Sequence, residues 1–161
     1  MDDEMKKIPL LLAAIFITSV PALADSTVTV IHGKTPDPTL IDVGQPGDSV
    51  GDQRIWHFDG KTTDDEAVAM DWIMTTTQAA DQDTGLESRV TLGVFTFGVN
   101  SSDRILIQGV GHYPAKGSTV KVASTLERAI TGGTGRYDGA RGTVVTTHMP
   151  DGTWQHVMHL D

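Results

Sequence analysis

The feature that most constrains the fold of this chain is a run of glycines near its C-terminus. Ala129 to Gly142 contains five glycines in fourteen residues and lies between two stretches rich in Val, Thr and Ile. Glycine accepts positive φ angles and lets another backbone segment approach closely, so this density predicts a sharp corner or bulge in a closed sheet. A phosphate-binding loop is the alternative, but the pattern G-x-G-x-x-G would need glycine where Asp138 stands, and the P-loop Lys-Ser/Thr pair is missing. We therefore interpret the segment as a structural turn.

The N-terminus has the pattern of a secretory signal peptide. Two lysines precede the apolar run 8–20, and the triplet Ala22-Leu23-Ala24 matches an A-x-A cleavage site. The run is shorter than the ~20 residues that a membrane span needs. We expect residues 1–24 to be a signal peptide, with Met5 as the true start, and residues 25–161 to form a single domain that is periplasmic or secreted, without a membrane anchor.

Composition narrows the partners of that domain. The chain has 12 basic and 21 acidic residues, and the part after the signal keeps 10 basic and 18 acidic ones. An acidic surface of this kind disfavours nucleic acid and acidic membranes as partners. Cysteine is absent, so disulfides contribute nothing and stability must come from packing, sheet closure or oligomerisation.

Short runs rich in β-branched and aromatic residues recur between Gly, Pro, Asp and Asn clusters, which predicts an all-β barrel or sandwich. The longest irregular stretch, Gly33 to Gly51, is expected to cross one end of a barrel. Pro150-Asp151-Gly152 has the chemistry of a tight hairpin turn. We expect eight strands: Ser26–His32, Asp52–Asp59, Ala67–Ala79, Glu87–Gly98, Asp103–Tyr113, Ser118–Ile130, Gly142–Met149 and Thr153–Leu160.

Alternation along these strands shows which side chains share a face. In the third strand one face carries Val68, Met70, Trp72 and Met74, which is the more apolar face. Core packing is favoured over ligand contact for these residues, and the pattern alone leaves open whether they line a lumen or meet a neighbouring subunit.

Motifs for metal or hydrolytic chemistry are weak. His156 and His159 are three positions apart, so on a strand they point to opposite faces and cannot share one ion. His57 shares a face only with Asp59, which is an incomplete ligand set, and no G-x-S-x-G motif is present. Asp81 to Gly85 resembles part of a calcium loop, but Leu92 stands where the bidentate acid belongs, so a hairpin is favoured. We expect no metal and no cofactor.

Several segments resemble the allene oxide cyclase and dirigent-protein superfamily. They are Gly47-Asp48-Ser49-Val50, the strand 54–58, the strand 104–109 and the glycine segment with its Ala140-Arg141-Gly142, so the resemblance spans about residues 47–148. It implies an eight-stranded antiparallel β-barrel, a homotrimer, and an apolar lumen that holds a small hydrophobic molecule.

The resemblance also implies site residues. Arg141 matches the arginine that dirigent proteins place after the glycine turn, and its alternative role is a salt bridge at the barrel end or hydrogen bonds to the turn. Arg54 stands where the cyclases carry an asparagine. We expect Arg141, His57, Tyr113 and His156 as candidate catalytic residues, and Met70, Trp72, Met74 and Arg54 as candidate ligand-binding residues.

Two functions follow from this interpretation. The first is a cyclase or isomerase that steers a hydrophobic substrate in the lumen, with Arg141 as the anion binder and a histidine or tyrosine as the proton donor. The second is a non-catalytic, dirigent-like binder or guide of a small apolar ligand. A lumen with only apolar walls would disfavour the first function, whereas Arg141 beside a histidine or aspartate at the floor of the lumen would favour it.

Overall fold

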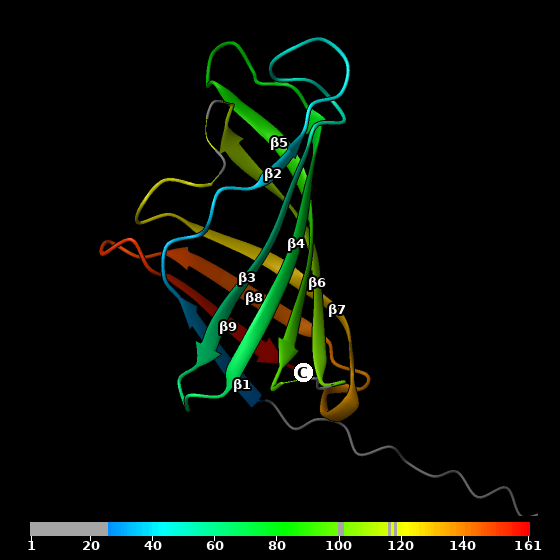
Figure 1. Ribbon diagram of the computed structural model, residues 1–161, viewed down its shortest axis with the longest axis vertical. Helices are drawn as coiled ribbons and strands as arrows, with labels where there is room; N and C mark the ends of the chain where they lie inside the picture. Colours follow the sequence, from blue (N-terminus) through cyan, green and yellow to red (C-terminus); the bar gives the residue numbers. More distant parts are fainter. Residues whose placement is uncertain (1–25, 100–101, 116, 118) are drawn as a thin grey trace, which may run out of the picture.

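Strands separated by tight turns account for nearly all of the secondary structure in the computed structural model, which describes residues 26–99, 102–115, 117 and 119–161 (Figure 1). The expected signal peptide lies outside these residues. In the described part no helix is both long and apolar enough to cross a membrane. The strands are β1 (Ser26–His32), β2 (Thr39–Ile41), β3 (Gln53–Thr62), β4 (Ala67–Gln78), β5 (Leu86–Phe97), β6 (Arg104–Pro114), β7 (Thr125–Thr134), β8 (Gly142–His148) and β9 (Trp154–Leu160).

Eight of these strands close into an antiparallel barrel in the order β1-β9-β8-β7-β6-β5-β4-β3, and β3 pairs back with β1. This confirms the predicted barrel and excludes the sandwich. The eight expected runs correspond to the eight barrel strands, with bounds that agree within three residues except at β7, which begins seven residues later than expected. The additional strand β2 lies in the long stretch after β1 and pairs with the first residues of β3, from Gln53 to Ile55.

The barrel has two unlike ends. The connections β4–β5, β6–β7 and β8–β9 and the loop after β1 lie at one end, which we call the pocket end. The connections β3–β4, β5–β6 and β7–β8 lie at the other, which we call the glycine end. Toward the pocket end the wall separates at two places. Strand β1 pairs with β3 only at Val30–Thr62 and Ile31–Lys61, and β6 leaves β7 after Gln108.

The glycine-rich segment forms part of strand β7 as well as a turn. Thr131 is the extra residue of a bulge, because Leu106 pairs with Gly132 while Ile107 pairs with Ile130. The turn proper is the 3₁₀ helix η1 (Gly135–Tyr137) and the residues after it. A Cβ at Gly133 would lie 2.1 Å from the Tyr137 carbonyl oxygen, so the close backbone approach requires glycine there. The predicted bulge and corner are therefore both present, but the strand extends four residues further than expected.

Two predicted hairpin turns are confirmed. Asp151 Oδ1 accepts hydrogen bonds from Thr153 N at 2.9 Å and Thr153 Oγ1 at 2.7 Å, and Gly152 has φ +84°. Asp81 Oδ1 accepts the backbone N–H groups of Asp83 and Thr84 in the β4–β5 turn. These side-chain to backbone bonds fix the register of the strands on either side.

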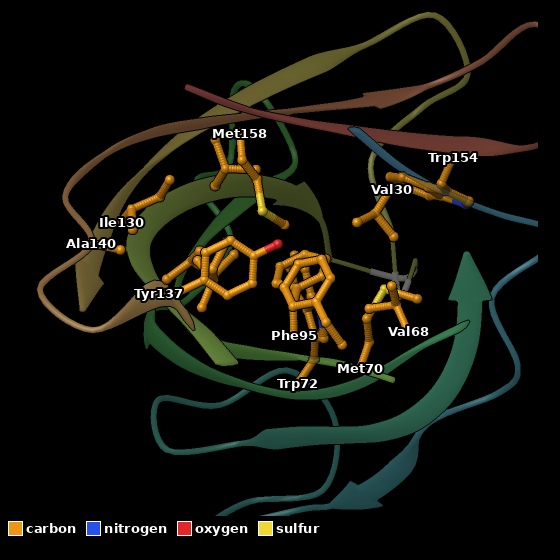
Figure 2. Close-up of a cluster of buried hydrophobic side chains, with 14 of the residues drawn as sticks. Val30, Val68, Met70, Trp72, Phe95, Ile130, Tyr137, Ala140, Trp154 and Met158 are labelled. Carbon is orange, nitrogen blue, oxygen red and sulfur yellow. The ribbon is translucent and has the colours of Figure 1, made fainter. Parts of the chain in front are cut away.

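The apolar faces of the strands point into the barrel. Val68, Met70, Trp72 and Met74 of β4 are all buried, which settles the question that alternation alone left open. Figure 2 shows Met70, Trp72 and Phe95 extending from their strands into one cluster inside the barrel. Apolar side chains such as Phe97, Ile130 and Tyr137 pack the interior toward the glycine end.

Candidate functional site

A pocket lies within the barrel at its pocket end. It encloses about 410 Å³ between side chains, counting its mouth, but only about 40 Å³ is wide enough to admit solvent. Its surface is mainly aromatic, and all three tryptophans of the chain take part. The lining residues are His32, Thr35, Trp56, Phe58, Trp72, Met74, Tyr113, Thr119, Val120, Leu126, Arg128, Thr146, Trp154 and His156.

The mouth of this pocket is formed where the barrel wall separates. The loop after β1 crosses the gap between β1 and β3, and its Pro36 carbonyl accepts a hydrogen bond from Trp56 Nε1 at 3.0 Å. Thr119 and Val120 of the β6–β7 connection cover the second gap. Trp154 at the start of β9 stacks on His148, with ring centroids 4.1 Å apart. The long irregular stretch was expected to cross one end of the barrel, and its first part does border the lumen.

Half of the predicted site residues line this pocket. Trp72, Met74, Tyr113 and His156 meet there from β4, β6 and β9. Met70 is fully buried in the core beside them and does not line the pocket. Alternation put Trp72 and Met74 on one face of their strand, and the structure shows that this face points into the barrel.

The other three candidates lie outside the pocket. His57 is on the exterior of β3, where its Nδ1 bonds Asp71 Oδ1 at 2.7 Å, and this contact raises its pKa. Arg141 is exposed at the glycine end, and its Nη1 donates to the Ala140 carbonyl at 2.6 Å. Arg54 is buried, but it belongs to the ion cluster described next and lines a neighbouring surface groove.

Beside the pocket, one carboxylate holds two buried arginines. Glu87 Oε1 pairs with Arg54 Nη2 at 3.1 Å and accepts a bond from Arg89 Nε at 2.5 Å, and both Glu87 and Arg89 are fully buried. Arg89 also donates to the carbonyl oxygen of Gly117 at 2.7 Å and lies over the Tyr113 ring. Asp52, 7% exposed, accepts two backbone N–H groups near Arg54, and these bonds lower its pKa. The negative charges of Glu87 and Asp52 therefore nearly balance the positive charges of Arg54 and Arg89.

A third buried arginine, Arg128 of β7, has no carboxylate partner among the described residues. It is 4% exposed, lines the pocket, and lies over the Trp72 ring at 5.1 Å. Its Nη2 donates to Tyr113 Oη at 2.6 Å and its Nη1 to Thr146 Oγ1 at 3.4 Å, while its Nε has no partner. A buried cation without a counter-charge is costly, which makes Arg128 the most unusual group in the pocket.

Two histidines continue from Arg128 as a chain of hydrogen bonds. Thr146 Oγ1 lies 3.0 Å from His156 Nδ1, His156 Nε2 lies 3.2 Å from His32 Nε2, and His32 Nδ1 lies 2.8 Å from the Gly33 carbonyl oxygen. Since Arg128 only donates and the carbonyl only accepts, the proton positions follow from the two ends. Thr146 donates to His156 Nδ1, His156 Nε2–H donates to His32 Nε2, and His32 Nδ1–H donates to Gly33.

Burial keeps both rings neutral. It lowers the pKa of His32 from 6.5 to about 4, against the raising effect of the Gly33 hydrogen bond. It also lowers the pKa of His156 well below 6.5, with smaller contributions from His32 and Arg128. Because every ring nitrogen already has a partner, neither histidine offers a free lone pair to a bound molecule.

Sequence reasoning missed Glu87, Arg89 and Arg128. The alternation of inward-facing and outward-facing residues along β5 and β7 could have identified them. Glu87 and Arg89 share a face with Phe95 and Phe97 along β5, and Arg128 lies between Leu126 and Ile130 on one face of β7. In the part of the chain that the structure describes, no three His, Asp or Glu side chains gather in a way that would hold a metal ion.

Comparison with known proteins supports the fold. No family model matches the chain, and no curated protein matches it. Among solved structures, a pyocyanin demethylase superposes with a TM-score of 0.63 at 18% identity, covering 84% of this chain and 100% of its own. A pterocarpan synthase dirigent protein superposes with a TM-score of 0.55 at 16% identity, covering 94% of this chain and 98% of its own. The chain therefore has the dirigent and allene oxide cyclase-like barrel fold that the glycine segment indicated.

Proposed function

We propose that this barrel binds a small, flat, largely apolar molecule in the lumen pocket and holds it in one orientation. The observation that carries the proposal is an aromatic pocket with a few buried polar groups at one side, which is the usual composition of a small-molecule site. Tyr113, Arg128, Thr146 and His156 supply those polar groups, while Trp56, Trp72 and Trp154 supply most of the apolar area. The names of the two solved relatives also describe activities on small molecules.

Binding requires the mouth to widen. The ~40 Å³ now open to solvent is well below the several hundred Å³ that a typical ligand site offers. The residues at the mouth belong to the loop after β1, the β6–β7 connection and the start of β9, and these segments border the places where the barrel wall already separates. A ligand would move these loops and leave the strands in place.

Orientation of a bound molecule is the step beyond binding that the pocket supports. Holding a reactive substrate in one geometry favours one cyclisation or isomerisation product without any proton transfer by the protein. The ring nitrogens of His32 and His156 are all engaged in hydrogen bonds, so His156 has no role as a base and the pocket acts by orienting the bound molecule. Tyr113 stays the candidate proton donor, since its hydroxyl oxygen accepts from Arg128 and its hydrogen has no acceptor among the described residues.

Assembly and location form part of the same proposal. Ile73 and Leu92 are 40% and 44% exposed and pair across β4 and β5, and Val110 on β6 is 57% exposed. Exposed apolar side chains on these neighbouring strands suit contact with other copies in the expected trimer. Export to the periplasm or the exterior is supported by the leader-like residues 1–24.

The test is titration with N-phenyl-1-naphthylamine, a neutral aromatic probe that accepts energy from tryptophan. Because all three tryptophans line the pocket, saturable energy transfer with one site per barrel is expected. Thr119→Phe, which narrows the mouth, is expected to weaken binding at least about tenfold, whereas Thr131→Phe on the exterior of β7 is the matched control. Absence of saturable binding, or equal effects of the two variants, would contradict the proposal.

A further inference from the structure

Resting on the proposed function, the geometry points to a narrower ligand class: we infer that the pocket selects an aromatic carboxylate, whose anionic group binds at Arg128 and Tyr113. Three features of the described residues carry this inference. They are the distribution of buried charge, the excess of hydrogen-bond donors at the polar side of the pocket, and the flat aromatic surfaces that surround those donors.

The buried charges leave Arg128 as the uncompensated cation. Among the described residues the buried carboxylates are Glu87, which pairs with Arg54 and Arg89, and Asp52, which lies near Arg54. No ion pair joins either of them to Arg128 in the described part of the chain. The neutral histidines beyond Thr146 add no charge to offset it. A ligand anion would supply the missing counter-charge in a place where water is largely excluded, and such pairs are stronger there than in solution.

Several hydrogen-bond donors at this side of the pocket lack an acceptor among the described residues. Arg128 Nε and Trp72 Nε1 are buried and have no hydrogen-bond partner, and the Tyr113 hydroxyl hydrogen has no acceptor among the described residues. The nearby acceptors, Thr146 Oγ1 and the histidine nitrogens, are already engaged. A carboxylate accepts several hydrogen bonds and donates none, so it matches this set better than an amide, an alcohol or an amine.

The surroundings favour an aromatic body on that carboxylate. The Arg128 guanidinium lies over the Trp72 ring, and Tyr113 lies between Arg128 and Arg89, so the donors are framed by flat faces. Trp56 and Trp154 lie nearer the mouth, at the starts of β3 and β9. A planar ring fits between such faces with little loss of conformational freedom, whereas a flexible chain would lose more.

The experiment compares benzoate, benzamide and benzamidine, which have the same shape and carry a negative, zero or positive charge. Each displaces N-phenyl-1-naphthylamine from the wild-type protein in competition at pH 7. Since hydrogen bonds to a charged group contribute about 1.5–3 kcal/mol, benzoate is expected to bind about tenfold to a hundredfold more tightly than benzamide, and benzamidine more weakly still. In Arg128→Met the preference for benzoate over benzamide is expected to shrink to about twofold or less.

Two further variants separate the explanations. Arg104→Met removes the same charge from an exposed site at the glycine end and is expected to keep the preference for benzoate. Tyr113→Phe keeps the ring and is expected to reduce the preference partially, which preserves a test if Arg128→Met does not fold. Equal displacement by benzoate and benzamide, or no displacement by any of the three while the neutral probe binds, would overturn the carboxylate assignment and leave the proposed function intact. Failure of the neutral probe to bind would overturn both.

Discussion

Acid should destabilise this barrel through its histidine chain. His32 has a pKa of about 4 in the folded protein against 6.5 for the free side chain, because its charged form is disfavoured by burial. Below pH 6.5 the unfolded chain therefore binds a proton that the folded chain does not, and stability falls as the pH falls until about pH 4. From pH 7 to pH 4.5 this single group lowers the free energy of unfolding by about 2.5 kcal/mol.

His156 acts in the same direction, since its pKa is also lowered by burial and by the nearby His32 and Arg128. The loss from His32 is therefore a minimum for the pair. The other charges facing these rings are Arg128 on β7 and His148 on β8, and both oppose protonation. The carboxylates with lowered pKa values, such as Asp52, lose their contribution only at lower pH.

The assay is urea unfolding followed by tryptophan fluorescence at several pH values between 7 and 4.5. The variant is His32→Phe, which keeps an aromatic ring beside Phe58 and His156 but cannot titrate. Its free energy of unfolding is expected to fall by about 2.5 kcal/mol less than that of the wild type over this range, after a constant offset for the lost hydrogen bonds. His159→Gln, an exposed histidine on the same strand as His156, is the control and should follow the wild type. Parallel curves for His32→Phe and wild type would refute the reasoning.

Three further predictions test the rest of the structure. Gly133→Ala places a Cβ 2.1 Å from a carbonyl oxygen and is expected to lower the free energy of unfolding in urea by at least about 3 kcal/mol. Gly139→Ala is the control, since its Cβ would meet no atom within 4 Å and only its φ of +79° is unfavourable, so it should cost about 1 kcal/mol. Equal costs for the two variants would contradict the close backbone approach at Gly133. Glu87→Gln removes the carboxylate shared by two buried arginines and should lower the free energy of unfolding by about 3–5 kcal/mol in the same assay. Glu127→Gln changes an exposed glutamate and should leave the free energy of unfolding nearly unchanged. An equally small effect of Glu87→Gln would contradict the ion cluster. Leu92→Asp on the exposed apolar face is expected to convert a trimer into monomers in native mass spectrometry, and a wild-type monomer would refute the proposed assembly.

The barrel was predictable from the sequence because its signals are local. Turn chemistry at Asp81 and Asp151 and the alternation within each strand depend on residues close together in the chain, and these predictions agree with the structure. Strand β7 was misplaced most, since it begins seven residues and ends four residues later than expected, and its end was hidden by glycines. Gly132 and Gly133 have turn-like identity, but β7 uses them in a bulged strand because the backbone after the turn packs against them.

The site was only partly predictable because it depends on side-chain contacts between different strands. Arg141 was favoured on the strength of its motif, but it lies in the β7–β8 connection at the glycine end, away from the pocket. Arg128 was overlooked because a charged residue in a strand usually faces solvent. Its contacts with Tyr113 and Thr146, 15 and 18 residues away, arise only when β6, β7 and β8 are placed side by side.

The two ends of the barrel explain why the polar groups gather where they do. At the glycine end the strands stay paired, the glycines let backbone segments meet directly, and apolar side chains fill the interior. At the pocket end β6 leaves β7 after Gln108, and the side chains of the separated strands must satisfy one another across a wider space. Arg128 of β7 reaches Tyr113 of β6 across this space, while Arg54 and Arg89 share the single carboxylate of Glu87. Arg128 therefore lies beside the opening of the wall and has no carboxylate partner among the described residues, so the place where a ligand would enter is also the place where a buried cation can select it.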